Sequence, residues 1–135
     1  MRVLGIDYGA ARIGIALGDT DSRIASPWQI IENRDFEVVE QKLLMIIQTE
    51  GIKTLVIGLP RRLHDQQEES AQVQEVRNFI TRLSVLGLPI VTENETWSSQ
   101  LAARYVQDRG EKGKRDDLAA VVILQSYLDR YGLSS

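Results

Sequence analysis

Three groups of acidic residues stand where the sequence predicts the ends of secondary-structure elements. Asp7 follows the apolar run at residues 2–6, Glu93 and Glu95 close a second apolar run, and Asp116 opens a helical pattern. A carboxylate beside a buried strand costs free energy unless a metal ion, a cationic side chain or backbone donors compensate its charge. Carboxylates that meet at one place can bind divalent cations and catalyse phosphodiester cleavage.

The segment around Asp7 allows three interpretations. Residues 5–19 read as two strands joined by a glycine-marked turn, with Asp7 at the tip of the first strand. Its carboxylate can hydrogen-bond within the turn before Gly9, as Asp often does. The pattern Asp-x-Gly-x4-Gly, from Asp7 to Gly14, can cradle a phosphate as in actin-like and sugar-kinase ATPases. Alternatively, Asp7 can bind metal in a nuclease of the ribonuclease H type.

Composition narrows the chemistry. The sequence has no cysteine and one histidine, which excludes disulfides and thiol catalysis and disfavours a Cys/His zinc site. Any metal would therefore be a hard cation held by oxygen ligands. A net charge of −3 argues against a protein that holds nucleic acid by bulk charge, although a local basic patch remains open.

Length and hydropathy predict one soluble domain. The 135 residues match the commonest domain size, so we expect a single domain over residues 1–135. The sequence enters a strand pattern directly, without the apolar core of a secretion signal, and has no apolar run near the ~20 residues of a membrane span. These features predict a cytoplasmic protein.

Apolar spacing and breaker residues predict the order of the elements. A helix is expected to be capped by Asn33 or Asp35 and to stop at Gly51, and a later helix is expected to stop at Gly87. Pro27 indicates an edge strand. The expected strands lie within residues 2–19 as a hairpin and at 23–31, 54–59 and 88–93, and the expected helices lie at 36–50, 69–86, from 97 onward and at 116–131.

This order predicts an α/β fold with a mixed five-stranded sheet and helices on both faces. Three antiparallel strands come first, and the first, fourth and fifth strands should run parallel, so that their C-terminal ends share one edge. Asp7 and the acids after the fifth strand would meet there, as a two-metal phosphodiester site requires. Two simpler roles stay open: Asp116 can cap its helix, and either Glu93 or Glu95 can be solvated.

The sequence resembles the YqgF or RuvX family of ribonuclease H-like proteins, which are described as Holliday junction resolvases and as nucleases acting on pre-16S ribosomal RNA. The resemblance covers about residues 2–131. It rests on several motifs: Gly5-Ile6-Asp7-Tyr8-Gly9, Arg12-Ile13-Gly14, Asp19, Val56-Ile57-Gly58-Leu59-Pro60, the segment 94–102, Asp116, Ala119-Ala120 and Ile123-Leu124-Gln125-Ser126-Tyr127-Leu128.

The resemblance implies a ribonuclease H-like fold and a metal-dependent endonuclease. The catalytic, metal-binding residues would be Asp7, Glu95 and Asp116, with two Mg²⁺ or Mn²⁺ ions as cofactors. The implied activity is processing of the 5′ end of pre-16S rRNA in ribosome biogenesis. One alternative is a junction resolvase in DNA recombination and repair, and another is a non-catalytic nucleic-acid-binding factor in ribosome assembly. The ATPase interpretation fits poorly, because 135 residues leave no room for a second domain.

The implied partner is nucleic acid, with pre-rRNA favoured over a DNA junction, and the protein would act as a monomer or a homodimer. Basic residues would contact the phosphate backbone, unless their loops are simply solvated. These candidates are Arg12, Arg61, Arg62, Lys112, Lys114 and Arg115.

Two stretches depart from the family pattern. Where the family usually has Asp-Glu-Arg-Leu-Thr-Thr, this sequence has Asn94-Glu95-Thr96-Trp97-Ser98-Ser99, so the glutamate is kept while an acid and an arginine are lost. Residues 64–68, which include His64, replace a glycine-rich loop. These differences favour the non-catalytic alternative, whereas the three acids favour the nuclease.

Overall fold

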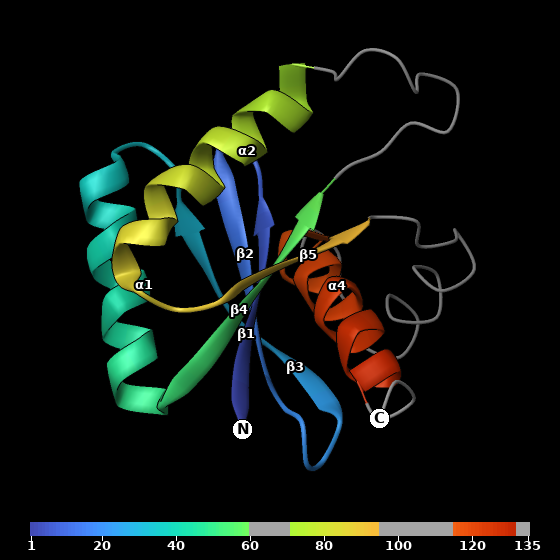
Figure 1. The fold of residues 1–135 in the computed structure, drawn as a ribbon. Coiled ribbons are helices and arrows are strands. Elements are labelled where there is room, and N and C mark those ends of the chain that lie inside the picture. The colour runs from blue at the N-terminus through green and yellow to red at the C-terminus, as the bar shows by residue number, and fades with distance from the viewer. Residues whose placement is uncertain (60–70, 95–114, 132–135) are drawn as a thin grey trace.

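The computed structural model describes residues 1–59, 71–94 and 115–131 of the chain (Figure 1). The elements follow one another as β1 (Arg2–Tyr8), β2 (Arg12–Asp19), β3 (Ile24–Glu32), α1 (Phe36–Glu50), β4 (Ile52–Leu59), α2 (Ala71–Leu83), the short 3₁₀ helix η1 (Ser84–Leu86), β5 (Ile90–Asn94) and α4 (Arg115–Tyr131). The helix expected from residue 97 lies outside the described residues.

The five strands form one mixed sheet in the order β3-β2-β1-β4-β5. β1 and β2, and β2 and β3, pair antiparallel, whereas β4 lies parallel to both β1 and β5. The predicted architecture is therefore confirmed, including the parallel set of the first, fourth and fifth strands. Because these three strands point the same way, Asp7, Leu59 and Asn94 all stand at the C-terminal edge of the sheet.

Helices cover both faces of the sheet: α1 and α2 lie on one side and α4 lies on the other (Figure 1). Along β1 the alternation of side chains divides the core. Leu4 and Ile6 are fully buried against the α1 and α2 side, whereas Val3 is fully buried against α4. Odd-numbered residues of β1 thus face α4, and this parity decides where Asp7 points.

The ends of α1 follow the predicted capping signals. The Asp35 side chain accepts a hydrogen bond from the backbone N–H of Glu37 at 3.0 Å. At the other end Gly51 adopts a left-handed φ of 67°, and its N–H donates to the carbonyl of Ile47. Leu43 is fully buried, and its neighbour Leu44 is exposed.

The second helix is shorter than predicted. α2 ends at Leu83, and η1 continues the turn to Gly87, which has a φ of 79°. The expected apolar face is present, because Val73, Val76 and Phe79 are buried against the sheet. Within the described parts of the chain, none of the helices is long and apolar enough to span a membrane.

α4 is tied to the far edge of the sheet through Gln125. The side-chain oxygen of Gln125 accepts from the N–H of Ala25 at 3.0 Å, and its amide nitrogen donates to the carbonyl of Arg23 at 2.8 Å. Arg23 has a positive φ of 58°, so these bonds hold the tight β2–β3 turn in place. The same turn lowers the pKa of Asp19, mainly because the backbone N–H of Asp21 donates to its carboxylate.

The edge strand β3 carries an irregularity beside Pro27, the residue that predicted an edge. Ile15 pairs with Gln29, and the next residue, Ala16, pairs with Pro27, so Trp28 is the extra residue of a β-bulge. The missing N–H of Pro27 and this bulge interrupt the outer hydrogen-bonding edge of the sheet.

Candidate active site

Asp7 lies at the C-terminal end of β1 and is half-buried. It interacts with other groups of the fold, so Asp7 is not without a partner. Asp7 has the same parity as Val3 and therefore lies on the α4 face of the sheet, at the edge where β4 and β5 also end.

Gly5 brings β1 and α4 into close contact. A Cβ placed on Gly5 would stand 2.7 Å from the Cβ of Leu124 and 3.0 Å from the carbonyl oxygen of Ala120. One strand away, a Cβ on Gly18 would meet the side chains of Leu124 and Leu128. Gly18 pairs with Val3, so the helix contacts move from Leu128 toward Ala120 as β1 runs toward its C-terminal end. The N-terminal turn of α4 consequently points to the edge that carries Asp7.

The same contact relates Asp7 to position 116. Asp7 lies two residues beyond Gly5 on the same face, an advance of about 7 Å along a strand. Position 116 lies four residues before Ala120, a step of about 6 Å along a helix, and shares its side of α4. Here the structure describes the backbone of Asp116, which stands in the first helical turn as predicted. The backbone therefore brings the two sequence positions to the same end of the β1–α4 contact.

Two glycines flank Asp7 within the sheet. Gly14 of β2 pairs directly with Asp7. On the other side, Ile6 pairs with Ile57, so the next residue of β4, Gly58, lies beside Asp7. Neither neighbour has a side chain that could fill the space beside the carboxylate. This arrangement suits an oxygen ligand that must admit a hydrated cation or a phosphate. Glycines inside strands were the available sequence signal for it.

Glu93 forms a buried ion pair, whereas the sequence suggested either an acid of the metal site or a solvated side chain. It pairs with Gly58 in the register of β4 and β5, and only 4% of its surface is exposed. Its carboxylate forms an ion pair with Arg130, which lies in the last turn of α4. Glu93 is therefore not solvated, and its charge is compensated at the end of α4 opposite to Asp116. Sequence reasoning missed Arg130, because nothing local links two residues 37 positions apart.

Replacing Arg130 by alanine should lower the free energy of unfolding by about 1.5–3 kcal/mol, because a buried carboxylate would lose its charged donor. Chemical denaturation measures this change. The matched control is Arg2→Ala, which breaks the pair with Glu50, a carboxylate more exposed than Glu93, and should cost only about 0.2–1 kcal/mol. Adding Glu93→Gln to Arg130→Ala should recover part of the loss. Equal effects of Arg130→Ala and Arg2→Ala would contradict this account of Glu93.

Most of the other predicted site residues lie outside the described residues. Of the basic candidates, Arg12 is exposed at the start of β2, where it makes contacts within the fold, and Arg115 is the first residue of α4. The described parts of the chain hold no group of three or more acidic or histidine side chains able to bind a metal. The predicted site residues outside the described parts are Glu95, Arg61, Arg62, Lys112 and Lys114.

Solved structures share this fold. The chain matches the RuvC structure of Thermus thermophilus with a TM-score of 0.64 at 12% sequence identity, covering 98% of this chain and 97% of that one. It matches the fowlpox virus resolvase, solved with substrate Holliday junction DNA, with a TM-score of 0.60 at 14% identity, covering 97% and 99% of the two chains. These similarities confirm the ribonuclease H-like fold expected from the sequence.

Closer relatives are found by sequence. A protein of Thermus thermophilus named "Putative pre-16S rRNA nuclease" is 36% identical over 135 residues, which cover 96% of this chain and 98% of the relative. A protein of Maridesulfovibrio salexigens with the same name is 35% identical, covering 96% and 99% of the two chains. The family model described as "RuvX: Holliday junction resolvase" matches residues 1–130. With its fold, its β1 and α4 motifs and nearly its whole length matched, the chain belongs to the RuvX family.

Proposed function

We propose that this protein is a metal-dependent endonuclease that acts in the cytoplasm on the precursor of 16S ribosomal RNA, at its 5′ end. Family membership supports hydrolysis of nucleic-acid phosphodiester bonds, and the relatives named for pre-16S rRNA support the RNA substrate. The observation that carries the proposal is the β1–α4 contact at Gly5, because it aligns Asp7 with the first turn of α4 at one edge of the sheet.

The proposed catalytic residues are Asp7, Glu95 and Asp116. Asp7 is supported by its position at the strand end between Gly14 and Gly58, two neighbours that have no side chain. Asp116 is supported by its place in the first turn of α4, where the helix dipole favours a negative charge by about 0.3–1 kcal/mol. Glu95 lies outside the described residues and is supported by the sequence, since it is the glutamate kept from the family's Asp-Glu-Arg motif.

These residues fit a pair of Mg²⁺ or Mn²⁺ ions, because carboxylates are the preferred ligands of such hard cations. When bound, the ions would supply an activated water and stabilise the charge that develops on the leaving oxygen. The protein's own part is positional. Asp7 is fixed by the central strand, and α4 is fixed against that strand through Gly5, so the backbone at positions 7 and 116 is held in place before substrate arrives.

Phosphate contacts complete the proposal. Arg12 is exposed at the start of β2, directly after the turn that follows β1, so it stands at the same edge of the sheet as Asp7. We assign to it, and to the remaining basic candidates, contacts with the phosphate backbone that set the register of the strand without reading its sequence. These remaining basic candidates are Arg61, Arg62, Lys112, Lys114 and Arg115.

A second candidate substrate is the four-way DNA junction. It is favoured by the family description as a Holliday junction resolvase and by the shared fold of the fowlpox virus enzyme solved with such a junction. Cleavage at two symmetric strands of a junction requires two active sites and hence a homodimer, whereas cleavage of a single RNA strand requires only a monomer.

The deciding experiment compares labelled pre-16S rRNA with a four-way DNA junction of matched length, each with Mg²⁺, with Mn²⁺ and with a chelator. We expect metal-dependent cutting of the RNA near the mature 5′ end and little or no cutting of the junction. Preferential cutting of the junction would replace RNA by DNA as the substrate. If folded protein bound the RNA but cut neither substrate, the nuclease proposal would fall in favour of a non-catalytic assembly factor.

A further inference from the structure

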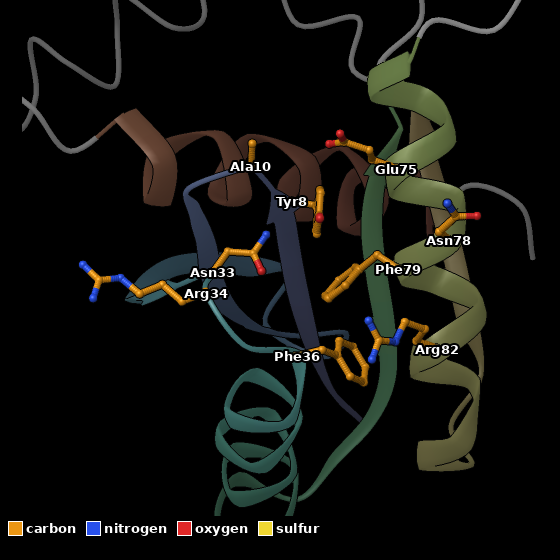
Figure 2. Close-up of a pocket in the computed structure, with 9 residues that line it drawn as sticks. All are labelled: Tyr8, Ala10, Asn33, Arg34, Phe36, Glu75, Asn78, Phe79 and Arg82. Atoms are coloured by element: carbon orange, nitrogen blue, oxygen red, sulfur yellow. The ribbon is translucent and has the colours of Figure 1, made fainter.

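A second feature lies beside Asp7 but on the opposite face of β1. A pocket of about 380 Å³ opens among the end of β1, the β1–β2 turn, the β3–α1 connection and α2 (Figure 2). Tyr8 of β1, Phe36 of α1 and Phe79 of α2 line it. Asp7 and Tyr8 are consecutive, so they point to opposite sides of the same strand end. The proposed catalytic edge and this pocket therefore adjoin at β1.

The pocket has an aromatic wall. The rings of Tyr8 and Phe79 lie 4.6 Å apart between centroids, tilted by 42°. Phe36 meets Phe79 edge-on, at 6.1 Å and 83°. Phe79 is buried, while Tyr8 and Phe36 keep part of their surface exposed. Partly exposed rings that are fixed by a third, buried ring provide a rigid surface for stacking.

Cationic and polar groups surround these rings. The guanidinium carbon of Arg82 lies 3.9 Å from the centroid of Phe36, and Figure 2 shows it beside the Phe36 and Phe79 rings. Arg34 is exposed and extends outward from the rim of the pocket. Its Nε lies 3.2 Å from Oε2 of Glu32, with which it forms an ion pair. A guanidinium held over a ring can contact a phosphate and also extend the stacking surface.

The wall beside Tyr8 is preformed. The Asn33 side-chain amide donates to the carbonyl of Gly9 at 2.8 Å, and the Asn33 backbone N–H donates to the carbonyl of Ala11 at 2.9 Å. These bonds fasten the β3–α1 connection to the β1–β2 turn. Across the pocket, Glu75 and Asn78 of α2 offer groups that can hydrogen-bond the edge of a base.

We propose that this pocket binds one unpaired nucleotide of the nucleic-acid strand that crosses the Asp7 edge, next to the phosphate that is cut. The base would stack on the wall formed by Tyr8 and Phe36, as single-stranded bases do on aromatic side chains. Arg82 would contact the adjoining phosphate. A volume of 380 Å³ is near the lower end of the range of about 300–1,000 Å³ typical of ligand pockets, which suits one nucleotide and excludes a duplex. This inference rests on the proposed function, because it assumes a nucleic-acid substrate.

The test measures binding of a short single-stranded RNA from the pre-16S 5′ region, and of a series of versions that each lack one base. Asp7→Asn protein is used throughout so that the strand is not cut. Removing the base at one position should weaken binding roughly tenfold, while removal elsewhere should change it much less. In Phe36→Leu, which keeps the apolar volume but removes the aromatic face, this selective loss should disappear. In Arg82→Gln, the loss of binding caused by removing that base should be smaller than in protein with Arg82 intact.

The matched control is Lys53→Gln, because Lys53 is an exposed cation at the start of β4, at the other end of the sheet. It removes the same charge and should preserve the base-selective loss. The inference is overturned if no single base matters, or if the selective loss persists in Phe36→Leu. Adenosine monophosphate bound as tightly as the RNA would mean a site for a free nucleotide and would also overturn it. Cutting of the RNA by the unaltered protein would still support the nuclease, whereas absence of any RNA binding would remove both proposals.

Discussion

Asp7→Asn should lower the rate of metal-dependent cleavage by on the order of 10³-fold or more, because the variant removes one charged metal ligand from the proposed site without changing its shape. It should also abolish or strongly weaken Mn²⁺ binding measured by calorimetry. The midpoint of thermal unfolding should change little, since the amide has nearly the same size as the half-buried carboxylate that it replaces.

The matched control is Asp19→Asn. Asp19 stands at the end of β2 that pairs with Arg2, so it lies at the opposite edge of the sheet from Asp7. This variant makes the same chemical change within the same sheet and should leave the cleavage rate within about twofold of the original, since Asp19 is not among the proposed metal ligands. Retention of cleavage and of Mn²⁺ binding by Asp7→Asn would contradict the assignment of Asp7.

Gly5→Ala should destabilise the fold and slow cleavage beyond what the loss of stability explains. The added methyl group would meet the Cβ of Leu124 at 2.7 Å and the Ala120 carbonyl at 3.0 Å, atoms that cannot swing aside without moving the helix. Overpacking of this kind costs about 1–3 kcal/mol, and the backbone contribution of replacing glycine in a strand offsets only part of it. As α4 moves outward, Asp116 should move away from Asp7, so the rate at low temperature should fall even for folded protein.

Gly18→Ala is the comparison that isolates this effect. Its methyl group would mainly meet the ends of the flexible Leu128 and Leu124 side chains, at 2.9 and 3.0 Å, which can change rotamer. We expect a smaller loss in unfolding free energy, measured by urea denaturation, and a rate close to the original. If Gly5→Ala left both stability and rate unchanged, the β1–α4 contact would not set the distance between the proposed carboxylates.

Much of the fold could be predicted because its signals are local. The near-continuous apolar run of β1, the Asp35 cap and the left-handed Gly51 each determine a short segment, and the order of elements then limits the sheet to few arrangements. The same local signals predicted Asp7 near the end of a strand and Asp116 in the first turn of a helix, where the structure has them. Helix boundaries were less exact at α2, where a 3₁₀ turn follows Leu83 and the apolar pattern continues into it.

Contacts between residues far apart in sequence could not be predicted. Nothing near Glu93 indicates that Arg130 compensates its charge, and a single strand glycine such as Gly5 does not show which helix approaches it. The aromatic pocket also depends on residues far apart in sequence, since Phe36 and Phe79 come from helices separated by β4. Tyr8 follows Asp7 directly in the sequence, but its contact with Phe79 depends on how α2 packs on the sheet.

The contact of Gly5 with Ala120 and Leu124 also has a consequence for biosynthesis. β1 leaves the ribosome early, whereas α4 follows more than 100 residues later in the chain. Domains fold as units during synthesis, and an incomplete chain cannot form this contact. The two carboxylates we assign to β1 and α4 can therefore come together only after α4 has emerged. Under the proposed function, a nascent or truncated chain that lacks α4 would be unable to cut the ribosomal RNA around it.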